Sequence, residues 1–566
     1  MGKTMGLGIQ TFDKIRERHC FYIDKTALIK EWWDNGDDVT LIARPRRFGK
    51  TLNMSMLEQF LSVQYRDRGD LFEGLSIWEE EDYRNLQGTF PVISLSFADV
   101  KESSFEGARK KICQIIRDLY DRHDYLLASE QLNENEKEQF QKISAEMENY
   151  LAKGSLKALS KYLTAYYGRK VIILLDEYDT PMQEAYVHGY WQELTDFIRG
   201  LFNSTFKTNP YLDRAVMTGI TRVSKESIFS DLNNLTVVTT TSDLYADSFG
   251  FTEAEVYAAL EAYGKKEQMP LVRQWYDGFV FGHQREIYNP WSILNYLKTG
   301  KVSAYWANTS SNSLVGKLVR EGSKKIKGIM ERLIKGESFH AQIDEQIIYD
   351  QLDTDETAVW SLFLASGYLK VLSYEQSLEE AEGWAENYEL ALTNLEVRIM
   401  FRKLIRSWFG PVESDYSDFT KALVRGDVEE MNAYMNRISE AVFSSFDTGK
   451  RPSGKAEPER FYHGFVLGLL VELGDRYVLT SNRESGFGRY DVQLEPRKEA
   501  DDAILLEFKV RDSKKEKSLE ETAQNALAQI ESRDYASGLR ERGIPEERIR
   551  KYGFAFEGKT VLIGEA

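Results

Sequence analysis

Cysteine, histidine and proline are all scarce in this sequence of 566 residues. The two cysteines, Cys20 and Cys113, lie far apart, which excludes a disulfide framework and a cysteine-rich zinc module and suits a reducing compartment. Six scattered histidines argue against a histidine-rich metal site. With 11 prolines and 39 glycines, the chain is neither collagen-like nor dominated by linkers.

Long apolar runs are also missing. No stretch approaches the roughly 18–20 residues that span a bilayer. The start, MGKTMGLG, has no apolar signal core, and Gly6 stands where a myristoylation pattern requires Ser or Thr. We therefore expect a cytoplasmic protein with no membrane partner.

What is present is a globular composition, 42% hydrophobic and 29% charged, with a length that suits three or four domains. The net charge of −17 would repel a polyanion, so any nucleic-acid contact needs a local basic surface. Residues 451–566 carry 20 Lys and Arg against 22 Asp and Glu, so most of the negative charge lies in residues 1–450.

Apolar runs alternate with helical stretches in the first half, a pattern that predicts α/β architecture. From about residue 251 the pattern turns mainly helical, beginning with Thr252 as N-cap and Glu255 at the third helical position. Gly, Pro and Ser gather in Ser445–Glu459, the best linker candidate, and α/β character returns after it. The clearest strands are Val39–Ala43, Pro91–Phe97, Lys170–Asp176, Arg214–Ile220 and Leu235–Thr241.

The first motif follows the strand Val39–Ala43. In RPRRFGKT, the residues Gly49, Lys50 and Thr51 match the end of the phosphate loop GxxxxGK[ST], although Arg44 stands at the first glycine position. Lys50 would reach the terminal phosphates and the Thr51 hydroxyl would help to hold Mg²⁺. Alternatively, this is a basic turn with a chance GKT.

Two acidic residues end the strand KVIILLD. Asp176 is placed to hold Mg²⁺, and the neighbouring Glu177 to polarise an attacking water. The alternative is that Asp176 only caps the next helix. Further along, Thr218, Thr221 or Arg222 could be a polar sensor or simple turn residues. Arg214 and Arg222 are the candidates for an arginine finger.

Taken together, these motifs resemble the bacterial AAA-ATPase-like family. The residues that carry the resemblance include YIDKT, RPRRFGKT, LLDEYDTP, FGFTEAEV and YNPWS. The resemblance implies ATP and Mg²⁺ as cofactors, with Arg46 and Arg47 as further nucleotide-binding candidates. The family characteristically has PRRFGK at this place, so the resemblance implies that Arg44, in place of the first glycine of the phosphate loop, is normal for the family. Members commonly carry a C-terminal nuclease-like domain of the PD-(D/E)xK superfamily.

The second motif lies in the C-terminal segment. Glu507 and Lys509 are two apart on one strand and so share a face, and Asp491 begins an adjoining strand. Asp491, Glu507 and the Phe508 carbonyl could hold Mg²⁺, and Lys509 could orient water or stabilise charge on a scissile phosphate. The alternative is an ordinary strand with an exposed Glu–Lys pair. In the PD-(D/E)xK resemblance, Asp491, Glu507 and Lys509 take the motif positions.

Weaker signals surround this motif. Gln529 matches the polar residue often seen in the following helix of that superfamily. Glu459 and His463 are candidates from the preceding helix, but surface or packing roles are the simpler interpretation. The basic stretch Arg511–Ser518 could contact phosphates or be a solvated loop. Four aromatic residues are expected in the core and not on a base-stacking surface: Trp275, Tyr276, Phe279 and Phe281.

We therefore expect an α/β protein with an ASCE-type P-loop ATPase domain (1–245), a helical lid or winged-helix-like middle region (246–445) and a restriction-endonuclease-like domain (459–566) that folds alone from about Ala456. The expected function is an ATP-binding and ATP-hydrolysing enzyme with a Mg²⁺-dependent nuclease domain that acts on DNA or RNA, in nucleic-acid processing or in defence against foreign DNA. The alternative is a nucleotide-switch scaffold with a non-cleaving tail. Oligomeric state stays open, a homo-oligomer included.

Overall fold

The computed structural model divides the chain into two compact units, Met1–Phe401 and Arg402–Ala566. Within the described residues, no helix is long and apolar enough to cross a membrane. The linker candidate Ser445–Glu459 and the candidates Glu459 and His463 lie outside the description. The structure describes all residues except 1–3, 223–227, 230–231, 308, 310–312, 322, 345–351, 353–354, 380–382, 408–415, 443–465, 467–468, 471–472, 474–475 and 486–487.

A parallel sheet of order β2-β3-β4-β1-β5 forms the centre of the N-terminal part. Every residue of β1 and β3 is buried, because helices cover both faces of the sheet and a parallel strand so covered is apolar throughout. The five predicted strands are thereby confirmed, with ends that shift by a few residues. Their bounds are β1 Val39–Ala43, β2 Val92–Ser96, β3 Val171–Asp176, β4 Leu212–Gly219 and β5 Leu235–Val238.

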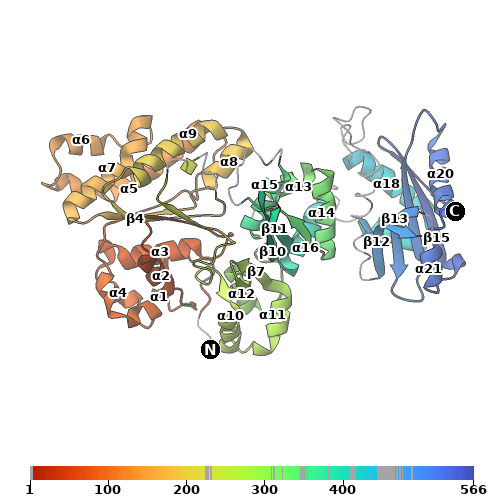
Figure 1. The fold of residues 1–566 in the computed structure, drawn as a ribbon, viewed down its shortest axis with the longest axis horizontal. Coiled ribbons are helices and arrows are strands. Elements are labelled where there is room, and N and C mark those ends of the chain that lie inside the picture. The colour runs from red at the N-terminus through yellow and green to blue at the C-terminus, as the bar shows by residue number, and fades with distance from the viewer. Residues whose placement is uncertain are drawn as a thin grey trace. The chain divides into compact units, whose positions relative to one another are not determined.

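Helices cover both faces of this sheet (Figure 1): α1–α4 lie on one face and α5–α9 on the other. Since all five strands are parallel, their carboxyl ends meet at one edge. β4 pairs with both β1 and β3, so the segments that follow Ala43 and Asp176 emerge close together. The helices are α1 Phe12–Glu17, α2 Ala27–Asn35, α3 Lys50–Leu61, α4 Glu81–Leu86, α5 Phe105–Asp121, α6 Glu134–Gln141, α7 Asn149–Tyr167, α8 Thr180–His188 and α9 Trp191–Phe202.

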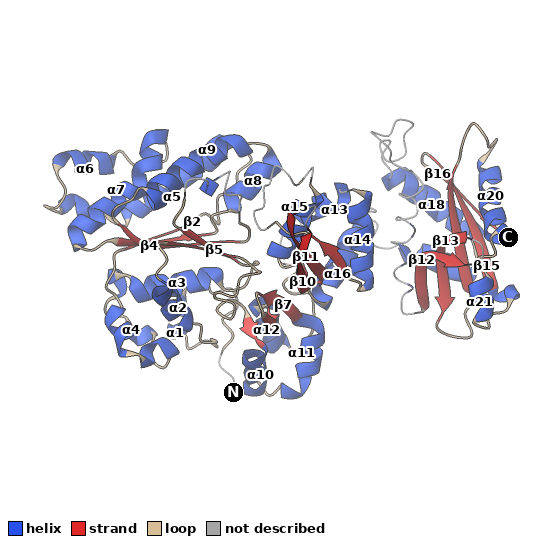
Figure 2. Ribbon diagram, in the orientation of Figure 1, coloured by secondary structure: helices blue, strands red, loops and turns tan. Residues whose placement is uncertain are grey.

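The middle region is helical, as predicted, and also carries two small antiparallel sheets (Figure 2). Its first helix begins with the expected capping box between Thr252 and Glu255. The predicted core aromatics Tyr276, Phe279 and Phe281 are buried. The elements are β6 Phe251–Thr252, α10 Glu253–Ala262, α11 Met269–Tyr276, β7 Asp277–Phe281, β8 Gln284–Tyr288, α12 Pro290–Thr299, α13 Ser313–Glu321, α14 Lys324–Lys335, β9 Phe339–Ala341, α15 Glu356–Ala365, β10 Leu369–Glu379, β11 Gly383–Leu392 and α16 Leu395–Ser407.

Residues 324–392 have the topology of a winged helix. A helix, α14, leads into the strand β9, and a second helix, α15, leads into the hairpin β10–β11. The sheet order β10-β11-β9 places the returning hairpin strand next to β9. We call residues 324–392 the winged-helix unit, α15 being the helix that precedes its hairpin.

The C-terminal unit is built on a second sheet, of order β12-β13-β14-β15-β16. β14 and β15 are parallel and the other neighbours antiparallel. Alternate residues of β14 face α20 on one side and α17 and α18 on the other. The elements are α17 Tyr416–Arg425, α18 Val428–Val442, β12 Tyr477–Ser485, β13 Gly488–Pro496, β14 Ala503–Val510, α20 Leu519–Ser532, α21 Ser537–Glu541, β15 Ile549–Glu557 and β16 Thr560–Glu565.

Helix α18 closes one edge of this sheet through its side chains. The amide of Asn432 donates to the Ile563 carbonyl at 2.9 Å and accepts from the Ile563 N–H at 2.8 Å. Asn436, one turn further on, makes the same pair of bonds with Val561, at 2.7 and 2.9 Å. The two asparagine side chains thus make the hydrogen bonds that a neighbouring strand would make to the backbone N–H and C=O groups of β16, the edge strand of the sheet.

The packing of α17 and α18 moves the boundary between the middle region and the C-terminal unit toward the N-terminus. The sequence placed residues 402–445 in the middle region, whereas α17 and α18 lie in the core of the C-terminal unit. An amphipathic sequence pattern identifies the apolar face of a helix but not the sheet against which that face packs. The α17 and α18 side chains buried in that core include Phe419, Leu423, Met431, Tyr434 and Met435.

Candidate nucleotide and metal sites

The phosphate loop is shaped by Gly49 and Lys50. Gly49 has a φ of 87°, a conformation open to glycine at little cost, and it precedes the first turn of α3. Because glycine has no side chain, no side-chain cap covers the first N–H groups of α3, which can receive an anion. Lys50 is buried, and its ammonium donates to the carbonyls of Arg44 and Pro45 at 2.8 and 2.9 Å.

Asp176 lies at the end of β3 between two hydroxyl groups. Thr51 donates to one carboxylate oxygen at 2.7 Å, and Thr218 donates to the other. Burial raises the pKa of Asp176 and lowers the pKa of Lys50. A cation beside Asp176 and phosphates beside Lys50 would relieve both desolvation costs, so the donor set fits a Mg²⁺–nucleotide.

Glu177 follows Asp176 in a left-handed conformation, with φ at 51°. Such a backbone is costly for a non-glycine residue and tends to occur at functional sites. Its half-buried carboxylate accepts a bond from the Thr180 hydroxyl at 3.3 Å. The carboxylate is thus held beside Asp176, a position from which it could polarise a water molecule.

The alternative role for Asp176, as a helix cap, is not what the structure shows. The N-cap position of α8 belongs to Asp179, which is itself buried. Asp179 accepts from the backbone N–H groups of Ile220 and Thr221 at 3.0 and 2.9 Å, and from the Thr221 hydroxyl at 2.9 Å. Asp179 therefore holds the segment after β4 in place through these hydrogen bonds, and Thr221 is one of the residues that it binds. The residue beside Asp176 is Thr218.

The arginines of the loop point in different directions. Arg44 is fully buried and donates to the Thr239 and Leu244 carbonyls beyond β5, so it anchors the loop and does not face phosphate. Arg46 donates to Gln183 of α8 at 3.1 Å, on the side of Asp176. Arg47 lies over the ring of Trp291 at 4.5 Å, toward α12.

Arg214 is remote from the loop. It lies near the amino end of β4, where it donates to the Trp33 carbonyl at 2.5 Å and stacks on the Trp33 ring at 4.2 Å. Arg222 comes after the carboxyl end of the same strand and lines a small cavity with Ala43. Of the two candidates for an arginine finger, only Arg222 lies at the appropriate edge of the sheet.

In the C-terminal unit, the predicted residues come together around Gln529. Glu507 and Lys509 lie on the face of β14 that is turned to α20. The Gln529 amide donates to the buried Glu507 carboxylate, and its oxygen accepts from the Lys509 ammonium at 2.7 Å. Asp491, on β13, accepts from the Phe508 N–H at 2.8 Å. Sequence reasoning thus placed all four side chains in one neighbourhood.

Tyr535 is the site residue that sequence reasoning missed. Its hydroxyl lies 3.1 Å from the Gln529 amide nitrogen, and its ring is buried. The charge of Glu507 contributes to the raised pKa of this tyrosine, although burial is the larger cause. Since Tyr535 follows the end of α20, helical periodicity could not place it, and only the register of the turn does so.

The metal-binding groups in both sites are few. Among the described residues there is no cluster of three or more His, Cys, Asp or Glu side chains suited to a metal ion. The C-terminal site offers Asp491, Glu507 and backbone carbonyls, and the N-terminal site offers Asp176, Glu177 and the Thr51 hydroxyl. Oxygen donors in this number suit a cation that keeps several waters, as Mg²⁺ does.

The basic stretch Arg511–Ser518 is an ordered loop. Arg511 pairs with Glu557 at 2.7 Å and also donates to the Lys517 carbonyl. Glu516 accepts from Thr522 and Asn525 of α20, each at 2.8 Å. Arg511 is therefore engaged in holding the loop, while Lys514 and Lys515 are exposed.

Two segments of the chain match known families. Residues 6–229 match the family described as predicted AAA-ATPase, and residues 457–566 match the PD-(D/E)XK nuclease superfamily. The chain therefore joins an AAA-ATPase-like domain to a PD-(D/E)XK nuclease superfamily domain, the architecture that the sequence motifs predicted.

Similarity to one relative extends over nearly the full length of both chains. A protein of Azotobacter chroococcum mcd 1, described as an uncharacterized protein in the vnfD 5' region, is 25% identical over 559 residues. The alignment covers 96% of this chain and 95% of the relative. The similarity thus includes the middle region as well as the two matched domains.

Proposed function

We propose that the protein binds and hydrolyses ATP at the N-terminal site and cleaves nucleic acid at the C-terminal site, each with a divalent cation. The observation that carries the first half is the 2.7 Å bond between Thr51 and Asp176, which joins the phosphate loop to the acidic end of β3. The second half rests on Gln529, which links Glu507 to Lys509 beside Asp491.

At the nucleotide site, each side chain has a separate task. The N–H groups at the start of α3 and the Lys50 ammonium hold the phosphates. Thr51 and Asp176 hold Mg²⁺, which when bound neutralises charge on the phosphates. Glu177 takes a proton from the attacking water, and Thr218 keeps Asp176 oriented. Arg46, on the Asp176 side of the loop, adds positive charge near the terminal phosphate.

At the C-terminal site, Asp491, Glu507 and the Phe508 carbonyl would hold a divalent cation that polarises the scissile phosphate. Lys509 would orient the attacking water or stabilise the charge that develops on the phosphate oxygens. Gln529 keeps Lys509 and Glu507 apart at a fixed distance, so that neither neutralises the other by direct pairing.

A nucleotide switch with a non-cleaving tail is the second candidate, and one observation favours it. Many cations of the C-terminal unit are paired with carboxylates and are less available to phosphates. Such pairs include Arg476–Asp501, Arg511–Glu557, Arg540–Glu546, Arg542–Glu495, Arg550–Asp502 and Lys551–Glu531.

ATP binding by the full-length protein is the first test. Calorimetry with a non-hydrolysable ATP analogue and Mg²⁺ should show one site per chain, and phosphate release should follow when ATP is supplied. Binding without phosphate release would favour the switch. No binding would remove the nucleotide-dependent function altogether.

A further inference from the structure

The phosphate loop is held from outside by two side chains of the middle region. The Trp306 indole N–H donates to the Arg46 carbonyl at 3.0 Å. The Asn289 amide approaches the carbonyls of Arg46 and Arg47, at 3.4 Å each. Both donors come from a region more than 240 residues further along the chain.

These contacts bear on how the loop receives phosphate. A trans peptide is planar, so its C=O and N–H point to opposite sides. Holding the carbonyls of Arg46 and Arg47 from outside turns the N–H groups of Arg47 and Phe48 the other way, toward the inside of the loop. A phosphate loop binds its ligand through such inward N–H groups. Asn289 and Trp306 thus orient peptides that a nucleotide needs.

The two donors are themselves fixed. Asn289 is the N-cap of α12, and its side-chain oxygen accepts from the Ser292 N–H at 3.2 Å, which sets the direction of its amide. The carboxylate of Glu396, on α16, accepts from the backbone N–H groups of Trp306 and Ala307 and from the Ser292 hydroxyl at 2.9 Å. One buried carboxylate therefore ties together the segments that carry both donors.

An aromatic chain continues the contact into the winged-helix unit. Phe48 of the loop packs edge-on against Phe279 with ring centroids 4.7 Å apart. Phe279 packs against Trp306 at 5.4 Å, and Trp306 against Tyr368 at 5.6 Å. Tyr368 directly precedes β10. Movement of the loop would have to be accommodated along this packed row.

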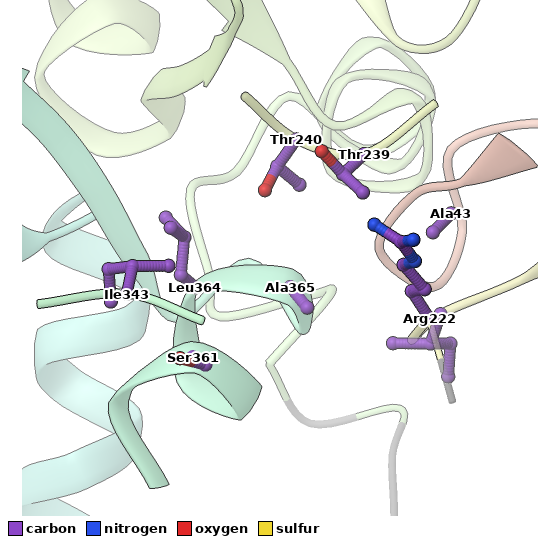
Figure 3. A pocket seen from close by; sticks show the side chains of 9 residues that line it. Ala43, Arg222, Thr239, Thr240, Ile343, Ser361, Leu364 and Ala365 are labelled. Atoms are coloured by element: carbon purple, nitrogen blue, oxygen red, sulfur yellow. The ribbon is translucent and has the colours of Figure 1, made fainter. Parts of the chain in front are cut away.

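The helix α15 is buried along most of its length, and its residues line a small cavity together with residues at the carboxyl ends of β1 and β5. Its residues 358–364 are all buried. Figure 3 shows Ser361, Leu364 and Ala365 of α15 across a cavity from Ala43, the last residue of β1, and Thr239, which directly follows β5. The cavity has a volume of about 20 Å³. A cavity of that size holds about one water molecule. In helix-turn-helix proteins the reading helix enters the major groove with an exposed face, which α15 lacks.

The composition of the hairpin β10–β11 also disfavours nucleic acid. Residues 374–389 contain six glutamates and neither Lys nor Arg. A wing that contacts DNA meets a dense row of phosphates, which such a segment would repel.

We propose that the winged-helix unit and the segment 289–306 form a clamp that positions the phosphate loop, and that this unit responds to nucleotide and does not read nucleic acid. The inference rests on the nucleotide binding proposed above. Asn289 and Trp306 are positioning residues: they act on the nucleotide through the Arg46 and Arg47 peptides. Because coupling is reciprocal, nucleotide in the loop must in turn stabilise the clamp.

The test uses the full chain with two variants, Trp306→Phe and Asn289→Ser. Phenylalanine keeps an aromatic ring and loses the indole N–H, and serine keeps an N-cap oxygen and loses the amide donor. Trp275→Phe makes the same chemical change on α11, away from the loop. Calorimetry with the Mg²⁺-bound ATP analogue should show ~3- to 10-fold weaker binding for the first two variants and none of this loss for Trp275→Phe.

Hydrogen exchange supplies a readout that simple loss of stability would not move. In the wild type, the ATP analogue should slow amide exchange in residues 356–365 and 369–379, and Trp306→Phe should reduce that protection. Wild-type affinity in both variants, or no nucleotide-dependent protection, would overturn the clamp. Protection of the same residues by a short DNA duplex would also overturn it. If the wild type binds no nucleotide, the proposed function fails first.

Discussion

Thr51 donates a hydrogen bond to Asp176 at 2.7 Å across 125 residues of sequence. The bond joins the first turn of α3, the helix that follows β1, to the end of β3; in the sheet, β4 lies between β1 and β3. It brings together the hydroxyl and the carboxylate that we propose as Mg²⁺ ligands.

Replacing Lys50 with alanine should weaken ATP binding ~10- to 100-fold. The ammonium is buried beside the loop carbonyls, and a charged hydrogen bond in such a place contributes about 1.5–3 kcal/mol. Calorimetry with the ATP analogue measures the change. Lys30→Ala is the matched control, because Lys30 pairs with Glu80 on an exposed surface. Equal affinities in the two variants would remove Lys50 from the site.

Replacing Glu177 with glutamine should leave ATP bound and slow its hydrolysis by about 100-fold or more, since a general base contributes roughly 10²–10⁴. Asp176 and Thr51 remain to hold Mg²⁺. Steady-state phosphate release, with binding measured in parallel, separates the two effects. Glu184→Gln changes the same group on α8, where Glu184 lies near His188 at 3.6 Å. Hydrolysis at the wild-type rate would show that Glu177 is not the base.

Two variants should separate metal binding from cleavage in the C-terminal unit. Asp491→Ala should lose both, because one of two carboxylate ligands is gone. Lys509→Ala should lose cleavage and largely keep the metal, because an ammonium cannot be a ligand. Mn²⁺ titration and a nuclease assay give the two readouts, with the exposed Glu541→Ala as control. Similar small effects in all three variants would place the site elsewhere.

The C-terminal unit should fold as residues 402–566 and not as residues 456–566. The shorter fragment lacks α17 and α18 and so loses five large buried side chains, each of which contributes about 1.5–3 kcal/mol when buried. The sum is comparable with the whole stability of a domain. Circular dichroism melting of both fragments decides the point. Equal cooperative melting would show that α17 and α18 are dispensable.

Glu396 should make the stability of the N-terminal unit depend on pH. Burial raises its pKa from 4.5 to about 7, despite the donors that favour the carboxylate. The folded state thus keeps a proton that the unfolded state has lost between pH 4.5 and 7. Stability from this group is present below that window and is lost as pH rises through it, by about 3 kcal/mol at most.

Glu396→Gln should remove that dependence, since the amide does not titrate. Denaturant unfolding at pH 5 and pH 8 measures the free energy of unfolding of both proteins. Relative to the wild type, the variant should be more stable at pH 8 than at pH 5. A difference between the two proteins that stays constant with pH would mean that Glu396 is ionised throughout.

The sheet of the N-terminal domain was predictable because its strands are buried on both faces and read as continuous apolar runs. Gly49, Lys50, Thr51, Asp176 and Glu177 could be located for the same reason. The carboxyl ends of parallel strands meet at one edge of the sheet, so a polar motif that directly follows such a strand must lie at that edge.

The rest depended on long-range packing. Nothing in the sequence around Asn289 or Trp306 shows that their donors reach the phosphate loop, because helix caps and buried tryptophans are common. The amphipathic pattern of α18 gave its apolar face but not the partner of Asn432 and Asn436. Tyr535 needed the register of a turn, which periodicity does not contain.

The most direct test of the account is cleavage by the full-length protein. Circular DNA and a structured RNA are incubated with Mg²⁺ or Mn²⁺, with and without ATP, using the wild type, Asp491→Ala and Lys50→Ala. We expect metal-dependent cleavage that Asp491→Ala abolishes, and an effect of ATP that Lys50→Ala removes. No cleavage of either nucleic acid in any metal or nucleotide state would contradict this expectation and favour the nucleotide-switch scaffold.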